Sequence, residues 1–431
     1  MHLLLVGMDH RSAPLAVRER CTWPPSETAA ALAAFRGGDV TEAALLCTCN
    51  RTELYAAALD PAAAAARAAA VFGARSGLEP SAVRPLLYTV VGAGDTLRHL
   101  ARVACGLDSL VLGETQVLGQ VKEAYQRSAE AGMVGQLLHG LFHQVLFCAK
   151  RVHSETALAA APGSVGGAAV ELARRTLGGL EGRHAVLLGA GETAEIVARR
   201  LHEAGFARID VVNRTPERAE GLAGTVGGAG HGAGDLPALL HAADVLITST
   251  AAPGPVVLPE HVAGRPPDRP LLIVDIAVPR DVHPDVGRMA GIRLRNIDDL
   301  QDVAAAGRAA RSGEAAAAEA IVDAEVRRFD AWLDGLAVAP VLAALAERME
   351  GMAREQAERA LRRMPDLAER ERDLVRQLAL GVVHKVLDTP LRRARDLAMV
   401  PGGSDRVRAL SDLFGLDLPA AVGLPGGERG A

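Results

Sequence analysis

The segment HAVLLGAGETAEIVARRL, residues 184–201, decides the fold of the middle of this chain. It opens with an apolar run long enough for a buried strand and closes with apolar residues at helical spacing. The turn between them, GAGETA, contains the two glycines of a dinucleotide-binding fingerprint. A strand, a glycine-rich turn and a helix in this order predict a nucleotide-binding βα unit.

Each residue of this turn has a physical reason to be there. Gly189 permits the tight turn, and Gly191 lets the backbone approach a pyrophosphate. Ala194 is small enough for the helix to pack on the strand, and the free N–H groups at the helix start bind phosphate. The alternative is a structural turn that holds no nucleotide. The predicted cofactor-binding residues of the turn are Gly189, Ala190, Gly191, Glu192, Thr193 and Ala194.

A second strand, IDVVNRT, follows about twenty residues after the turn, as the fingerprint requires. In enzymes that use NAD this strand ends in an acid that binds the ribose, whereas here it ends in Asn213, Arg214 and Thr215. A guanidinium and a hydroxyl suit a 2′-phosphate, so these residues predict NADPH as the cofactor. The alternative for Arg214 is an ordinary solvated surface arginine.

Strands and helices alternate from Gly182 to Asn296, which predicts a parallel, doubly wound sheet. The predicted helix covers 194–204, and the predicted strands are 184–188, 209–213, 244–248 and 271–276. Before this region the chain mixes strands with helices, which indicates a separate α+β domain. Its predicted strands are 3–6, 43–47 and 53–57, and its predicted helices are 95–104 and 116–131.

After Asp298 the sequence is rich in Ala, Arg, Glu and Leu at helical spacing, which predicts a helical arm interrupted at Pro340, Pro365 and Pro390. The arm carries an apolar stripe that needs a surface to cover it. A homodimer would cover it, and a bundle that folds back on its own chain is the alternative. The stripe consists of Val341, Leu342, Leu345, Met349 and Met352.

These regions together predict an α/β multidomain protein. The small, polar segment 157–165 reads as a linker between the first two domains. The predicted divisions are an N-terminal α+β domain over 1–156, a Rossmann-type domain over 157–296, a helical domain over 297–400 and a loose tail over 401–431.

Composition limits what the protein can be. Hydrophobic residues make up 49% of the 431 residues but aromatic residues only 3%, which favours cores of Ala, Leu and Val. A net charge of −5 argues against a protein that coats nucleic acid without specificity. The five cysteines form no paired metal spacing, and we predict no metal site. The start of the chain does not resemble a signal peptide and no stretch is long and apolar enough for a membrane span, so a soluble, cytoplasmic protein is expected.

A thiol lies at the end of another predicted strand, in LCTCNRTEL, residues 46–54. Cys49 leaves the strand and is followed by Arg51, whose guanidinium would favour the thiolate that attacks an ester. The same cation could pair with a substrate carboxylate. Most unpaired cysteines are small buried hydrophobes, so the thiol alone indicates little. Joined to a nucleotide domain, it predicts a nucleophile working with a hydride donor, with Cys47 as the rival thiol.

Motifs along the chain closely resemble the glutamyl-tRNA reductase family, in the same order and over nearly the whole length. The matching segments are MDHRSAPLAVRE (8–19), LCTCNRTELY (46–55), RHLARVACGLDSLVLGETQVLGQVKEAY (98–125), LLGAGETA (187–194), VVNRT (211–215), DIAVPRDVHPDV (275–286) and HKVLDTPLRRAR (384–395). Cys47 stands where many relatives have serine.

The resemblance implies a catalytic N-terminal domain, an NADP-binding domain and a C-terminal dimerisation domain. It implies that Cys49 captures the glutamyl group of glutamyl-tRNA as a thioester, that Arg51 binds the side-chain carboxylate and that Glu114 receives the α-ammonium group. His99 would influence the chemistry, although by itself it could equally be a packing residue. The substrate-binding residues carried over are Thr48, Asn50, Arg51, Ser109, Glu114, Thr115, Gln116 and Gln120.

The same resemblance implies reduction to glutamate-1-semialdehyde for tetrapyrrole synthesis and transfer of the product to an aminotransferase. Because the thiol and the nucleotide turn lie on different domains, closure is needed, and we expect hinges near Ala160 and Asn296. Haem regulation, a theme of the family, cannot be placed on any residue. Two rivals remain: an NADP-dependent dehydrogenase of the shikimate dehydrogenase kind, which would not need Cys49, and a non-catalytic nucleotide or tRNA sensor.

Overall fold

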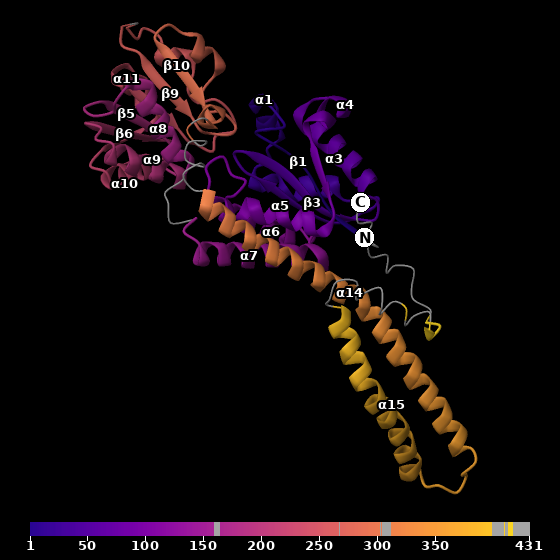
Figure 1. Cartoon of the computed structure of the whole chain (residues 1–431). Helices are drawn as coiled ribbons and strands as arrows, with labels where there is room; N and C mark the ends of the chain where they lie inside the picture. The colour runs from indigo at the N-terminus through magenta and orange to yellow at the C-terminus, as the bar shows by residue number, and fades with distance from the viewer. Residues whose placement is uncertain are drawn as a thin grey trace. The chain divides into compact units, whose positions relative to one another are not determined.

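The computed structural model describes residues 1–158, 164–266, 268–301, 303, 312–398, 409 and 413–416. It divides into two compact units: a larger unit, Leu3–Asp323, and a smaller unit made of Met1–His2 with Ala324–Ala431. The larger unit contains both β-sheets, and the smaller contains the C-terminal helices (Figure 1). The hinge expected near Ala160 and most of the predicted tail lie outside the described residues.

A four-stranded sheet forms the first half of the larger unit. Its order is β2 (Val40–Cys47), β3 (Arg51–Ala58), β1 (His2–Asp9) and β4 (Tyr88–Val91). Strand β4 was not predicted, because its four residues are too few to show a period. The sheet packs with helices whose apolar faces cover it: α2 (Thr28–Phe35), α3 (Pro61–Ser76), α5 (Ala93–Ala104), α6 (Gln116–Glu130) and α7 (Gln136–Glu155).

A six-stranded sheet forms the second half. Its order is β10 (Ile292–Asn296), β9 (Leu271–Asp275), β8 (Val245–Thr248), β5 (His184–Leu188), β6 (Arg208–Asn213) and β7 (Ala229–Gly232). Every neighbouring pair is parallel, which confirms the predicted doubly wound sheet. The helices that accompany it are α8 (Val165–Leu177), α9 (Glu192–Glu203), α10 (Pro216–Gly224) and α11 (Leu236–Ala242).

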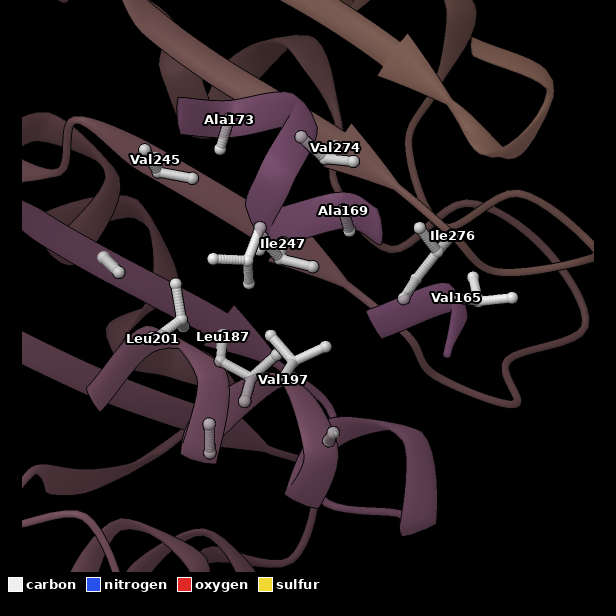
Figure 2. Close-up of a cluster of buried hydrophobic side chains, with 14 of the residues drawn as sticks. Val165, Ala169, Ala173, Leu187, Val197, Leu201, Val245, Ile247, Val274 and Ile276 are labelled. Carbon is white, nitrogen blue, oxygen red and sulfur yellow. The ribbon is translucent and has the colours of Figure 1, made fainter. Parts of the chain in front are cut away.

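Helices α8 and α9 bury their small and branched residues against this sheet (Figure 2). Ala169 and Ala173 of α8 allow close packing near Ile247 of β8, and Leu201 of α9 lies near Leu187 of β5. The same buried cluster includes Leu110 and Val111 from the first half of the chain. The two halves of the larger unit therefore share part of one core.

The C-terminal region consists of two long helices, α14 (Ser312–Leu361) and α15 (Glu369–Ala398). The expected breaks at Pro340 and Pro390 were wrong, since each proline lies inside a continuous helix. A proline removes one backbone hydrogen bond, and in helices of this length the remaining bonds hold the element together. Only Pro365 lies between the helices.

The apolar stripe predicted in α14 is partly covered by α15 of the same chain. Val338 and Leu342 pack with Leu391 and Ala394, whereas Met352 is exposed. A second apolar row, on α15, lies open in this unit at a spacing of four residues: Leu374, Leu378, Val382 and Val386. Self-packing therefore covers the start of the predicted stripe and leaves the α15 row without cover.

Among the described residues, one segment, Gly313–Leu361, is long and apolar enough to cross a membrane by length and composition. This qualifies the expectation from sequence that no such stretch exists. Its apolarity comes largely from alanine and leucine, and core helices of soluble proteins satisfy the same criteria.

Candidate active site

Cys49 is presented by the short connection between β2 and β3. The backbone N–H of Thr48 donates to the carbonyl oxygen of Arg51 at 2.8 Å, which closes the connection. The Thr48 hydroxyl oxygen accepts the N–H groups of Asn50 and Arg51, both at 3.2 Å. These bonds fix the loop and leave the half-buried Cys49 side chain at its tip.

A cavity of about 170 Å³ in the larger unit opens beside this loop. It gathers most of the residues carried over from the resemblance: Thr48, Cys49, Asn50, Arg51, Ser109, Glu114, Gln116 and Gln120. Thr115 and His99 are not among the residues that line it. Residues that lie up to 72 positions apart in the sequence, Thr48 and Gln120, thus line the same cavity.

The opposite wall of the cavity comes from the nucleotide-binding half. Thr193 of α9 belongs to the predicted cofactor turn, and the other lining residues there were not predicted: Val165, Ser249, Thr250, Ile276, Ala277 and Val278. Most of the unpredicted residues follow β8 and β9, at the carboxyl ends of parallel strands, where ligands bind in such sheets. That rule is the signal by which they could have been found.

Arg51 is buried in a network of acids. Its Nη1 donates to Glu53 Oε1 at 2.7 Å, and its Nη2 donates to the backbone oxygen of Asp108 at 2.5 Å and to Asp108 Oδ2 at 3.1 Å. Its side chain is only 3% exposed. A guanidinium has five N–H donors, so part of the fork stays available for a ligand.

Glu53 is the centre of this network and is fully buried. Besides Arg51, it accepts the hydroxyls of Tyr55 and Tyr88, both at 2.5 Å, and it lies 2.8 Å from His99 Nε2. Burial opposes ionisation, but the charge of Arg51 and the bond from His99 hold the pKa of Glu53 well below its usual range. His99 therefore contacts the acid behind the cavity, and its role in the chemistry stays a prediction.

The pKa of Cys49 differs from what its neighbour Arg51 suggested. Burial and the negative charge of Glu114 raise it to about 12, and they outweigh the opposite effects of Arg18 and Arg51. Arg51 does favour the thiolate, as expected, but its effect is smaller than those of burial and Glu114. In these surroundings the Cys49 thiol ionises less readily than that of a free cysteine.

Several polar groups at the cavity lack a protein partner. Within the described part of the chain, Asn50 Oδ1 and Ser249 Oγ are buried without a hydrogen bond. The Glu114 side chain is 4% exposed, and burial raises its pKa to about 7. A buried polar group without a partner costs free energy, so this cavity is suited to a polar ligand that supplies the missing partners.

Glu114→Gln is expected to stabilise the fold at alkaline pH. A folded-state pKa raised from 4.5 to about 7 means that ionisation opposes folding, so stability is complete below pH 4.5 and falls as the pH rises through about 7. The shift corresponds to about 3 kcal/mol, and we expect a gain of about 2 kcal/mol because the amide also lacks partners. Urea unfolding at pH 8 and pH 4.5 measures it. An equal gain at both pH values would contradict this origin, and Glu123→Gln, at an exposed acid, is the control.

The predicted nucleotide turn fits a dinucleotide. Gly189 has φ +120°, and a Cβ there would lie 2.9 Å from the backbone oxygen of Ser249, so only glycine fits. A Cβ at Gly191, the N-cap of α9, would meet no atom within 4 Å, which leaves open space before the helix start. Ala194 is fully buried against the core. These features leave room for phosphates at the N–H groups of α9.

The end of β6 carries the other predicted cofactor residues. Arg214 and Thr215 are exposed, and Asn213 Nδ2 donates to the backbone oxygen of Thr215 at 3.1 Å. A cavity of about 530 Å³ lies beside the turn and is lined by Ala190, Arg199 and Arg218 among others. The two arginines of this cavity were not predicted, and they add positive charge beside the nucleotide turn.

The described residues contain no group of three or more His, Cys, Asp or Glu side chains that could hold a metal ion. Two histidines, His139 and His143, stand four residues apart on α7, a spacing that the prediction of no metal site left out. Their rings lie 4.1 Å apart, and the Tyr125 hydroxyl is 2.7 Å from His139 Nδ1. The pair packs against Tyr125 of α6, and none of these three residues is among those that line the Cys49 cavity.

Comparisons with known families match almost the whole chain. The family model for the glutamyl-tRNA(Glu) reductase N-terminal domain matches residues 6–156, the model for shikimate/quinate 5-dehydrogenase matches 171–303, and the model for the glutamyl-tRNA(Glu) reductase dimerisation domain matches 317–416.

Individual relatives agree with these models. A glutamyl-tRNA reductase of Desulforudis audaxviator is 40% identical over 430 residues, which cover 99% of this chain and 96% of the relative. One of Geobacillus kaustophilus is 37% identical over 421 residues, covering 97% and 92%. The solved structure of glutamyl-tRNA reductase from Methanopyrus kandleri is 29% identical, with a TM-score of 0.48, and covers 96% of this chain and 99% of that one. The chain belongs to the glutamyl-tRNA reductase family.

Proposed function

We propose that this protein reduces glutamyl-tRNA(Glu) to glutamate-1-semialdehyde with NADPH, through a thioester on Cys49, at the start of tetrapyrrole biosynthesis from glutamate. The observation that carries this proposal is the cavity around Cys49. A nucleophile, unpartnered polar groups and the strand ends of a nucleotide-binding sheet all face it.

In the first step, Cys49 Sγ attacks the ester carbonyl of the substrate. The carbon–sulfur bond forms, the carbon–oxygen bond to the tRNA breaks, and the tRNA hydroxyl leaves with the proton that the thiol gave up. Arg51 is fixed by its hydrogen bonds to Glu53 and Asp108, and its remaining N–H groups donate to the side-chain carboxylate of the substrate. Asn50 Oδ1 is available to accept a hydrogen bond from the glutamyl group.

Substrate binding itself would activate Cys49. The α-ammonium of the glutamyl group beside Glu114 would cancel the negative charge that helps to keep the pKa of Cys49 at about 12. The thiol would therefore ionise more readily when the substrate is present than in the free enzyme. This limits reactions of a free thiolate with other electrophiles.

The residues present fit a dinucleotide at Gly189–Ala194, with Asn213, Arg214 and Thr215 at its 2′-phosphate. When bound there, NADPH supplies a hydride to an acyl carbon. The chain itself holds the thioester and shields it, since Ile276 and Val278 are apolar and line the same cavity as Cys49. Release of the aldehyde returns the electron pair of the carbon–sulfur bond to Cys49.

Gly189→Ala is expected to weaken NADPH binding by about 100-fold or more, because a side chain at φ +120° and 2.9 Å from the Ser249 oxygen forces the turn to move. Quenching of intrinsic fluorescence on titration with NADPH measures the dissociation constant. Gly224→Ala, at the end of the nearby helix α10 where a Cβ meets nothing within 4 Å, is the matched control. Unchanged affinity in Gly189→Ala would place the nucleotide elsewhere.

The smaller unit has a dimerisation-domain match, and we propose a homodimer through the C-terminal helices. The open row on α15, Leu374, Leu378, Val382 and Val386, is the surface for it, since exposed apolar residues at helical spacing call for a partner. A cytoplasmic location and transfer of the reactive aldehyde to an aminotransferase complete the proposal.

One experiment separates this function from its rivals. The purified protein is incubated with NADPH and either glutamyl-tRNA or free glutamate, and in a second arm with NADP⁺ and shikimate. We expect NADPH to be oxidised when glutamyl-tRNA is present and not when free glutamate replaces it. Turnover of shikimate would favour a plain dehydrogenase, and NADPH binding without any oxidation would favour a sensor.

A further inference from the structure

Two consecutive charged residues of the N-terminal half, Arg18 and Glu19, contact the nucleotide-binding half of the larger unit. Arg18 ends α1 (Leu15–Arg18), and Glu19 begins the short helix η1 (Glu19–Cys21). Neither was predicted as a site residue, and the reaction described above does not use them. Their charges are opposite, and so are those of their partners.

Arg18 joins the nucleophile's loop to the other half of the unit. Its side chain is only 3% exposed, and Nη1 donates to the backbone oxygen of Cys49 at 3.2 Å. Nη2 of the same group donates to Asp298 Oδ1 at 2.5 Å, while Nε donates to the Ala13 oxygen at 3.1 Å. Asp298 lies in η6 (Ile297–Leu300), directly after the edge strand β10. One rigid guanidinium therefore touches the Cys49 backbone and the edge of the nucleotide-binding sheet.

Glu19 makes the second connection. Arg280 donates to it through Nε at 2.9 Å and Nη2 at 2.6 Å, a two-point pair whose side chains are 16% and 28% exposed. Arg280 comes two residues after Val278, which lines the Cys49 cavity. The pair thus fixes the segment that forms one wall of the cavity.

The order of charges makes these contacts selective. The N-terminal half presents a cation and then an anion, and the nucleotide-binding half presents an anion at 298 and a cation at 280. A displaced alignment would bring like charges together or leave the buried Arg18 without its carboxylate, and both are costly. Only one alignment satisfies both pairs.

We infer that Arg18 and Glu19 are positioning residues that align the nucleotide-binding sheet over Cys49, and so decide whether the captured acyl group is reduced or lost to water. The inference rests on the proposed function. Because the pairs act on alignment, they affect hydride transfer, which needs the two halves in register, more than acyl transfer, whose nucleophile Cys49 and carboxylate-binding Arg51 both lie in the N-terminal half. Reaction rates respond steeply to such alignment: a displacement of about 1 Å can cost roughly 100-fold.

The test reverses the charges of the partly exposed pair. Glu19→Arg, Arg280→Glu and the double variant are each given glutamyl-tRNA, and two products are measured: aldehyde formed with NADPH, and glutamate released without it. We expect each single variant to lower the ratio of reduction to hydrolysis by about tenfold or more, since like charges then oppose each other. The double variant, in which the pair is rebuilt with its signs exchanged, should return the ratio to within about threefold of the wild type.

A second variant tests the Arg18 contact without disturbing the buried arginine. Asp298→Asn keeps the shape of the side chain and removes its charge, and it should lower the same ratio while NADPH affinity is unchanged. The matched control is the exposed pair Arg359 and Glu355 of α14, whose reversal should leave the ratio as it is. Circular dichroism checks the fold of every variant.

The outcomes distinguish this inference from the proposed function. If the wild type neither reduces nor hydrolyses glutamyl-tRNA, the proposed function fails. If the wild type reduces it and the folded single variants and Asp298→Asn keep the wild-type ratio, the alignment role is wrong. Loss of both products in equal measure, or a folded double variant that restores nothing, also overturns the role, because the pair would then act on general structure.

Discussion

Cys49→Ser is expected to abolish NADPH oxidation with glutamyl-tRNA, by a factor on the order of 10⁴ or more, as removal of a covalent nucleophile does. A serine hydroxyl at the tip of the β2–β3 connection would be far less ionised than a thiol, and no base bonded to it would take its proton. Wild-type protein incubated with labelled glutamyl-tRNA and no NADPH should carry the label on the Cys49 peptide, released by hydroxylamine. The serine variant should carry none.

Cys47→Ser is the matched control for this experiment. Cys47 ends β2 two residues earlier and is likewise a free, half-buried thiol whose pKa is raised to about 11 by burial. Cys47 does not line the cavity of about 170 Å³ that Cys49 shares with Glu114 and Ser109. The serine variant should therefore stay active. If Cys49→Ser were active and Cys47→Ser inactive, the nucleophile would be Cys47 and not Cys49.

The nucleotide-binding half shows how far a local pattern determines an element. The strand 184–188 was predicted with the bounds that β5 has, because four consecutive apolar residues, Ala185 to Leu188, directly before a glycine turn favour a short buried strand. Strand β7, Ala229–Gly232, was missed since AGHG has no β-branched or large apolar residue. It forms a strand because its backbone pairs in parallel with β6. Its own residues do not show that this pairing is available.

In the active site, too, some features follow from the local sequence and others depend on residues far away in the chain. The loop that carries Cys49 and the turn at Gly189 are short motifs whose residues stand together in the sequence. The partners of Arg51 are different: Asp108 is 57 residues away, and His99 reaches Glu53 across 46. Such pairings depend on the tertiary fold, so the sequence did not reveal that two acids, Glu53 and Asp108, pair with Arg51. The pKa of Cys49 was misjudged because burial and the nearness of Glu114, 65 residues further along the chain, outweigh the effects of Arg18 and Arg51.

Glu53→Gln is expected to reduce both stability and activity. Glu53 accepts bonds from Arg51, Tyr55, Tyr88 and His99, and an amide has one oxygen where the carboxylate has two. The buried Arg51 would lose the charge that balances it, which costs about 3–5 kcal/mol when one partner of a buried pair is removed. Chemical denaturation measures this loss. In the folded fraction, kcat/KM should fall about 100-fold because the fork that receives the substrate carboxylate is no longer held.

The form of the kinetic defect separates positioning from general damage. If Glu53 acts through Arg51, KM for glutamyl-tRNA should rise, whereas the affinity for NADPH, bound on the other half, should stay unchanged. Glu123→Gln, in an exposed ion pair with Arg127, is the control and should cost no more than about 1 kcal/mol. Equal losses of NADPH affinity and substrate affinity in Glu53→Gln would mean that the network supports the fold as a whole. A normal KM would mean that Arg51 keeps its place through Asp108 alone.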